Sequence, residues 1–164
     1  MHPVDKPHKP GQIRVVKDAA AEYQGTSLNK HLLTGPDLLS SLVGNLMRFR
    51  TGKVGLAADI EAMYHQVRVP QQDADSLRFL WKEDITKEGP PDVYQMLVHI
   101  FGAKDSSGCA NYALHRAARD HHRGYSSSTF ESCLKAFYVD DLLKAVQSTE
   151  DAICLAEELI SIMA

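Results

Sequence analysis

The sequence lacks the patterns of secreted, membrane-spanning and thiolate-metal proteins. Its three cysteines, Cys109, Cys133 and Cys154, are isolated and form no CxxC pair, which indicates a reducing compartment and argues against a thiolate zinc site. The N-terminal residues contain no apolar signal segment, and no run approaches the ~18 consecutive apolar residues that span a bilayer. We therefore expect a soluble intracellular protein, cytoplasmic or nuclear, with no membrane partner.

The chain also lacks an excess of positive charge. Its 18 Lys and Arg residues stand against 21 Asp and Glu, a formal net charge of −3, so a global basic footprint for nucleic acid is missing. Local runs of cations do occur, such as Arg48, Arg50 and Lys53, and such runs are more often solvated faces than binding sites. The patterns GxxxxGK[ST], HExxH and GxSxG, which mark phosphate-loop enzymes, zinc proteases and serine hydrolases, are absent too.

The patterns that are present predict one α+β domain. At 164 residues and 44% hydrophobic content, the chain can bury a real core. Apolar periodicity predicts helices over residues 35–50 and 106–122 and, after a capping box at Ser148, a final helix. Apolar runs predict strands over residues 13–16, 54–59, 77–81, 93–100, 133–139 and 142–146. Because strands and helices do not alternate strictly, a mostly antiparallel sheet is favoured.

The most informative stretch is an acidic pair within an apolar run, Phe137-Tyr138-Val139-Asp140-Asp141-Leu142-Leu143. Carboxylates are costly inside a sheet unless something pairs with them. The pair is therefore either a tight turn between strands or a ligand for a divalent cation. A second apolar strand, residues 54–58, also leads into an acid, Asp59. Neighbouring strands would make Asp59 and Asp140 the principal ligands, with Asp141 more peripheral, because successive strand residues point to opposite faces.

Three segments stand in the order of reverse transcriptase motifs A, B and C. They begin with Asp59-Ile60-Glu61, Phe101-Gly102-Ala103 and Tyr138-Val139-Asp140-Asp141. With residues 28–39 and 77–81 as flanks, nearly the whole chain resembles the reverse transcriptase of Pao/BEL-class LTR retrotransposons. The resemblance implies a right-hand polymerase palm over residues 54–164, with helices on one face of its sheet, and a partial fingers region over residues 1–53.

The resemblance also implies RNA-directed DNA polymerase activity. Asp59, Asp140 and Asp141 would be the catalytic carboxylates and, with the backbone carbonyl of Ile60, would bind two Mg²⁺ ions, Mn²⁺ being an alternative. Oxygen ligands of this kind suit both metals. The ions would activate the 3′-hydroxyl of a primer, on an RNA or DNA template, for attack on the α-phosphate of a dNTP.

The family further implies a set of nucleotide-binding residues: Arg14, Ile60, Tyr64, Phe101, Gly102 and Ser106. Tyr64 would exclude a ribose 2′-hydroxyl by steric conflict, Arg14 would grip the triphosphate, and Gly102 would let backbone approach the nucleotide. Ordinary explanations stand beside these roles: a core aromatic for Tyr64, a solvated strand residue for Arg14, a plain turn for Gly102 and a helix N-cap for Ser106.

The sequence departs from the family in several places. Asp105 adds an acid near motif B, and Lys17 stands where the family has an aromatic. The thumb, connection and RNase H regions have no counterpart, which predicts a fragment of a polyprotein whose missing domains would be partners. One alternative is a catalytically inactive retrotransposon remnant, acting if at all as a nucleic-acid-binding or interaction module. Another is a metal-dependent nuclease or phosphatase that uses the same carboxylates.

One histidine cluster offers a competing metal site. His115 and His122 lie at helical spacing around Arg119, and the two imidazoles could resemble a metal pair. A third ligand is not evident in the sequence. We therefore interpret this segment as a solvated polar helix face.

Overall fold

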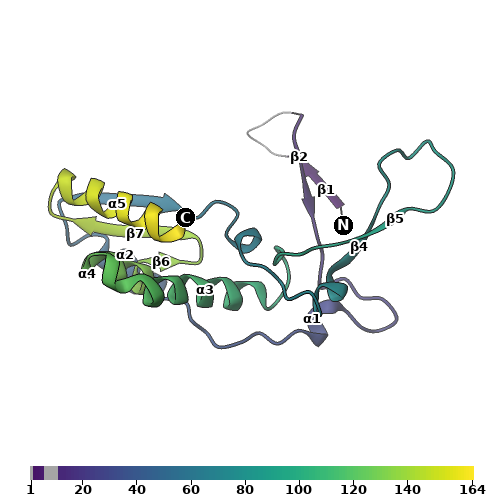
Figure 1. Ribbon diagram of the computed structural model, residues 1–164, viewed down its shortest axis with the longest axis horizontal. Helices are drawn as coiled ribbons and strands as arrows, with labels where there is room; N and C mark the ends of the chain where they lie inside the picture. Colours follow the sequence, from purple (N-terminus) through teal and green to yellow (C-terminus); the bar gives the residue numbers. More distant parts are fainter. Residues whose placement is uncertain (1, 6–10) are drawn as a thin grey trace. The chain divides into compact units, whose positions relative to one another are not determined.

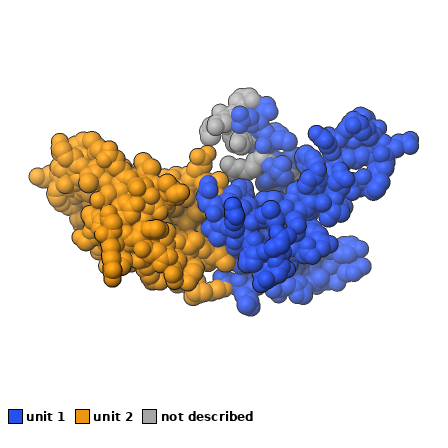
Figure 2. Space-filling model, in the orientation of Figure 1, with its two compact units in different colours: residues 1–34, 64–106 blue, residues 35–63, 107–164 orange. Residues whose placement is uncertain are grey.

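The computed structural model describes residues 2–5 and 11–164, without the side chains of His2 and Arg14. The chain divides into two compact units, each built from two stretches of sequence (Figure 2). Unit 1 comprises Met1–Thr34 and Tyr64–Ser106, and unit 2 comprises Gly35–Met63 and Ser107–Ala164. The boundary expected after residue 53 therefore falls inside unit 2.

Unit 1 contains two antiparallel ribbons of two strands each (Figure 1). Strand β1 (His2–Asp5) pairs with β2 (Ile13–Val16), and β4 (Arg78–Trp81) pairs with β5 (Asp92–Gln95). The predicted strands at residues 13–16 and 77–81 are thus confirmed, whereas the strand predicted over 93–100 ends at Gln95. The short helical elements around them are α1 (Leu28–His31), η1 (Met63–Gln66) and η2 (Ala74–Leu77).

Unit 2 is organised around a three-stranded antiparallel sheet of order β3-β7-β6. These strands are β3 (Val54–Asp59), β6 (Phe137–Tyr138) and β7 (Asp141–Val146). Its helices are α2 (Leu42–Arg48), α3 (Ser106–His121), η3 (His122–Gly124), α4 (Ser127–Lys135) and α5 (Thr149–Met163). Helix α5 packs along β3 and β7, and α2 packs against β7 and β6 (Figure 1).

The core of unit 2 follows from the apolar residues of its last two elements, β7 and α5. Leu142 on β7 is 1% exposed, and Leu155 and Leu159 recur on α5 at helical spacing with exposures of 4% and 6%. The N-cap bond of the predicted capping box forms at the start of α5, where the Ser148 hydroxyl accepts a hydrogen bond from the Asp151 amide at 3.1 Å. Burial of this apolar face holds the helix against the sheet.

The first predicted helix of unit 2 begins later than expected. Residues 35–41 are not helical, and α2 starts after Ser41, whose hydroxyl accepts a hydrogen bond from the Gly44 amide. Gly35 has a φ of +74°, and the Asp37 carboxylate accepts from the Leu39 amide two residues on. Asp37 therefore closes a local turn, which competes with helix formation.

A second correction concerns the segment before the acidic pair. The strand predicted over residues 133–139 is wrong at its start, because Cys133 to Lys135 belong to α4 and only Phe137–Tyr138 form β6. The preceding Gly/Ser stretch reads as a loop, yet Ser126 caps α4 by accepting from the Thr129 amide at 3.2 Å. A serine-rich stretch supplies caps as readily as turns, so its composition alone did not separate the two.

The fold class is α+β with antiparallel sheets, as predicted. None of the helices in the described part of the chain is long and apolar enough to cross a lipid bilayer.

Candidate functional site

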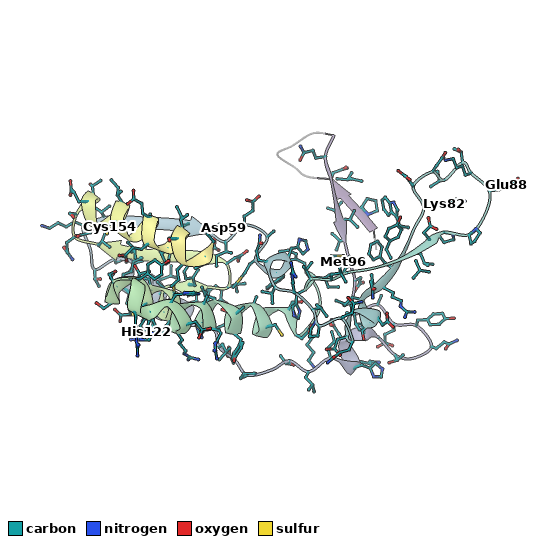
Figure 3. The ribbon with its side chains drawn as sticks, in the orientation of Figure 1. Asp59, Lys82, Glu88, Met96, His122 and Cys154 are labelled. Atoms are coloured by element: carbon teal, nitrogen blue, oxygen red, sulfur yellow. The ribbon has the colours of Figure 1, made fainter. Side chains whose placement is uncertain are left out.

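The register of unit 2 brings two of the predicted catalytic acids face to face. Strands β3 and β7 run antiparallel, and Asp59, the last residue of β3, lies directly opposite Asp141, the first residue of β7. Directly opposed residues of an antiparallel pair place their Cβ atoms about 4.5–5.5 Å apart on one face of the sheet. Figure 3 shows Asp59 at the end of its strand. Two strands that are far apart in the sequence therefore place their carboxylates next to each other.

Asp140 reaches the same end of the sheet through the turn between β6 and β7. Tyr138 pairs with Asp141, which leaves a two-residue turn of Val139 and Asp140. The Asp140 carbonyl accepts a hydrogen bond from the Ile60 amide at 3.0 Å, and this bond ties the turn to the chain that leaves β3. The predicted ranking placed Asp140 ahead of Asp141. The register instead makes Asp141 the cross-strand neighbour of Asp59, and the metal roles of all three stay predictions.

The turn carries a backbone conformation that its residue disfavours. Val139 has a φ of +58°, a region that glycine adopts readily and β-branched residues rarely occupy. Holding a residue there costs about 1–3 kcal/mol. Strained backbone of this kind is concentrated at functional sites. Here the strained residue is Val139, which directly precedes Asp140 and Asp141.

The electrostatics of this cluster favour a cation. Among the described residues, none of the carboxylates of Asp59, Asp140 and Asp141 has a hydrogen-bond or ion-pair partner. Asp59 and Asp141 are exposed, and Asp140 is half-buried. Like charges directly opposite each other destabilise a strand pair, so a bound divalent ion would relieve the repulsion. Carboxylate oxygens are the donor set that Mg²⁺ and Mn²⁺ prefer.

The predicted backbone ligand, the carbonyl of Ile60, is already in use. It accepts a hydrogen bond from the Met63 amide at 3.2 Å. A carbonyl oxygen has two lone pairs, so this bond leaves one acceptor position available to a metal ion.

In unit 1, the predicted nucleotide-binding aromatics lie against each other. The rings of Tyr64 and Phe101 have centroids 4.6 Å apart and are tilted by 50°, and the His65 ring meets Phe101 edge-on at 5.5 Å. Tyr64 is half-buried and Phe101 is 50% exposed. Tyr64 is therefore not a fully buried core aromatic, and the cluster presents ring surface to solvent.

Gly102 occupies a position that only glycine tolerates well. Its φ is +95°, and a Cβ added there would lie 2.7 Å from the Lys17 carbonyl oxygen. The Asn29 side chain donates to the Gly102 carbonyl at 3.0 Å and accepts from the Lys104 amide at 2.9 Å. The turn explanation therefore accounts for this glycine by itself, and its role toward a nucleotide stays a prediction.

The other residues that were predicted near the nucleotide lie in different local environments. Ser106 is fully buried, and its hydroxyl donates to the Ile100 carbonyl at 2.7 Å, which closes the turn before α3. Arg14 lies on β2 opposite Val4, and its side chain lies outside the described residues. Lys17, which stands where the family has an aromatic, places its ammonium 5.0 Å from the centre of the Phe79 ring. Burial lowers the pKa of this lysine.

One polar pair in unit 1 was not predicted as a pair. His99 is 8% exposed, and its Nδ1 lies 3.7 Å from an oxygen of Asp105, the extra acid near motif B. The other Asp105 oxygen is buried and has no hydrogen-bond partner among the described residues. The sequence marked Asp105 as unusual but gave no sign that a turn would fold it back onto His99.

The histidine-rich segment of unit 2 behaves as a polar helix face. His122 Nδ1 lies 2.7 Å from the Arg119 carbonyl, and its ring packs near Phe130 at 6.1 Å. Burial, followed by the charge of Arg119, lowers the pKa of His115. The contacts of His122 give this histidine local partners that do not require a metal.

No protein-family model matches this sequence, and no curated protein matches it either.

Proposed function

We propose that this chain is the nucleotidyl-transfer part of a reverse transcriptase, with unit 2 as its palm and unit 1 contributing fingers-like elements. The observation that carries the proposal is the register that sets Asp59 opposite Asp141 at the end of β3 and β7, with Asp140 in the adjoining turn. The order of the three motifs along the sequence supports it. Both features would be unexplained in a protein that used these acids only to close a turn.

The donor set fits divalent ions that bind oxygen. Unpartnered carboxylates at the end of a sheet, close to a carbonyl with a free lone pair, match the ligands of Mg²⁺ and leave no place for a thiolate. Two ions bound there would activate an attacking hydroxyl and stabilise the leaving oxygen of an in-line phosphoryl displacement.

The chain's own residues would position the reactants. The reaction joins the primer 3′-oxygen to the α-phosphorus of a dNTP, and the bond from that phosphorus to the pyrophosphate oxygen breaks. Asp59, Asp140 and Asp141 would hold the charge that gathers the ions, and the strained Val139 turn would keep the acidic pair in place. The exposed face of the Tyr64 and Phe101 rings would contact the sugar of the nucleotide.

The proposal is tested by primer extension. Purified chain is incubated with a primed RNA template, dNTPs and Mg²⁺, and incorporation is measured for the parent and for Asp59→Asn and Asp140→Asn. We expect metal-dependent incorporation that both substitutions abolish. Glu157→Gln removes one negative charge from the exposed side of α5 and should leave incorporation unchanged.

Calorimetric titration with Mn²⁺ separates the alternatives. Binding that Asp59→Asn removes, without incorporation but with hydrolysis of a phosphodiester substrate, would indicate a nuclease or phosphatase. Binding of a template–primer duplex with no metal binding would indicate a catalytically inactive nucleic-acid-binding module. An Asp140→Asn variant as active as the parent would refute the polymerase assignment.

A further inference from the structure

A basic pocket lies in unit 2 where α2 and α4 end beside β7. Its volume is about 130 Å³, and its charged lining consists of Arg48, Lys135, Lys144 and Glu131. Three basic residues and one acidic residue thus line a single small cavity in a chain whose formal net charge is −3. The sequence placed Arg48 in a short cationic run, and the fold brings Lys135 and Lys144 to it from distant segments.

Arg48 is held in a fixed orientation with donors to spare. One of its terminal nitrogens donates to the Asn45 side-chain oxygen at 2.5 Å and to the Lys135 carbonyl at 3.0 Å. Its Nε and its other terminal nitrogen have no hydrogen bond among the described residues. A guanidinium has five N–H donors in a planar fork that matches phosphate oxygens. The pocket therefore contains a preorganised group of the right shape for an oxyanion.

Two of the three cations also have a structural explanation, but the third does not. Arg48 and Lys135 are the last residues of α2 and α4, and cations are favoured at the negative end of a helix dipole. Lys144 lies on β7, is half-buried, and makes no hydrogen bond or ion pair within the described part of the chain. Its charge acts on Glu131 without a hydrogen bond between the two side chains among the described residues, so the donors of its ammonium are available to an external anion.

The single acid of the pocket does not cancel its positive charge. Glu131 bonds Lys135 at 3.2 Å, and this bond, followed by the charge of Lys144, lowers the pKa of the Glu131 carboxyl. Glu131 thus remains ionised and engages Lys135, while Arg48 and Lys144 keep free donors. An incoming anion would face these two residues.

We propose that this pocket binds a phosphate group of a nucleic-acid strand. The choice of strand rests on the proposed function, and position along β7 supports it. Leu143, Lys144 and Ala145 line the pocket, and they lie two, three and four residues beyond Asp141 along the strand. At ~3.4 Å per residue they are about 7–14 Å from it, which is about two to four base steps along a duplex. Phosphate contacts fix the register of a bound strand.

The test measures binding without catalysis. A fluorescent primer–template duplex is titrated with the full chain in EDTA, at several salt concentrations, in an Asp140→Asn background. We expect Lys144→Gln to weaken binding about three- to tenfold, irrespective of sequence, and to reduce the slope of log K against log salt by about 1. Lys144→Arg, which keeps the charge, should bind like the parent. Arg123→Gln, which removes the same charge outside the pocket, should change binding less than twofold.

A second arm identifies the source of the phosphate. Amide resonances of Leu143, Lys144 and Ala145 are followed by NMR during titration with the unlabelled duplex and, separately, with inorganic phosphate. Shifts with the duplex that Lys144→Gln removes support the proposal. Shifts with inorganic phosphate alone, or equal duplex affinity of Lys144→Gln and Arg123→Gln, overturn it. Because neither arm uses metal or incorporation, a failure of the polymerase assignment leaves these outcomes unchanged.

Discussion

In unit 2, Leu142, Leu155 and Leu159 are 1–6% exposed, whereas in unit 1 the side chains of Leu80, Val93 and Ile85 are 61–86% exposed. Unit 2 has a three-stranded sheet that helices cover, and unit 1 has two separate two-stranded ribbons. A two-stranded ribbon is marginally stable in water, and three strands with a packed face are not. We infer that unit 2 is stabilised by apolar burial, while unit 1 depends more on turns and polar links.

The predicted acids and the predicted nucleotide-binding residues therefore belong to units that are stabilised differently. The carboxylates project from the sheet of unit 2, where the register is backed by a buried face and a one-residue slip would expose Leu142. The predicted nucleotide-binding residues Tyr64, Phe101 and Gly102 lie in unit 1, where Gly102 is held by the side chain of Asn29. We therefore expect hydrogen exchange to be slow in β7 and fast in β4 and β5.

We expect the largest change in the free energy of unfolding from a core truncation in unit 2, and this change tests the comparison between the units. Leu142→Ala should lower the free energy of unfolding by about 3 kcal/mol, because it leaves a cavity beneath the sheet. Leu80→Ala in unit 1 removes the same atoms from an exposed site and should change it by less than about 0.5 kcal/mol. Urea denaturation, with hydrogen exchange to assign the loss to a unit, measures both. Equal losses would contradict the inferred difference.

A smaller effect is expected where unit 1 relies on a polar link. Asn29→Ala removes the bonds to the Gly102 carbonyl and the Lys104 amide, which should cost about 1–2 kcal/mol. Asn29→Asp keeps the acceptor for Lys104 but loses the donor, so its loss should be about half as large. Exchange of the Lys104 amide reports the change. If Leu80→Ala destabilised unit 1 more than Asn29→Ala, apolar contacts would dominate there as well.

The smallest effect concerns pH in unit 2. Glu158 on α5 accepts hydrogen bonds from the hydroxyls of Ser126 and Thr129, and these bonds lower the pKa of its carboxyl from the ordinary 4.5. A carboxyl with a lower pKa in the folded state contributes stability above pH 4.5, and loses it as pH falls through the folded value.

The denaturation midpoint should therefore fall below pH 4.5 in the parent, and fall less in Glu158→Gln. Glu157→Gln, one residue away on the exposed side of α5, should keep the parent's pH dependence. If Glu158→Gln and the parent had identical acid profiles, the bridge between α4 and α5 would contribute no pH-dependent stability.

Local signals account for the elements that were predicted well. The apolar run of Val54–Asp59 and the Ser148 cap specify their elements through contacts within a few residues, so β3 and α5 form as predicted. Where local signals compete, the prediction failed. Asp37 closes a turn instead of starting a helix, and Ser126 caps a helix instead of joining a loop.

The candidate site was predictable in its members and not in its geometry. The acidic pair and Asp59 stand out because carboxylates next to apolar strands require a reason. The sequence did not indicate which of these acids lie opposite each other. The two-residue turn at Val139 and Asp140 sets the register, and this register makes Asp141 the neighbour of Asp59. The His99 and Asp105 pair escaped prediction for the same reason, because it depends on how a turn folds back.

By itself, the sequence determined the strands β2, β3, β4 and β7, the helices α3 and α5 with the apolar faces that they bury, and the acids that interrupt the apolar runs. Only the tertiary structure decided which strands pair, which residues stand opposite one another, and that Lys135 and Lys144 share a pocket with Arg48. The physical reason is distance along the chain. Periodicity and caps act over a few residues, whereas register and pocket lining arise from the packing of segments that only the folded chain brings together.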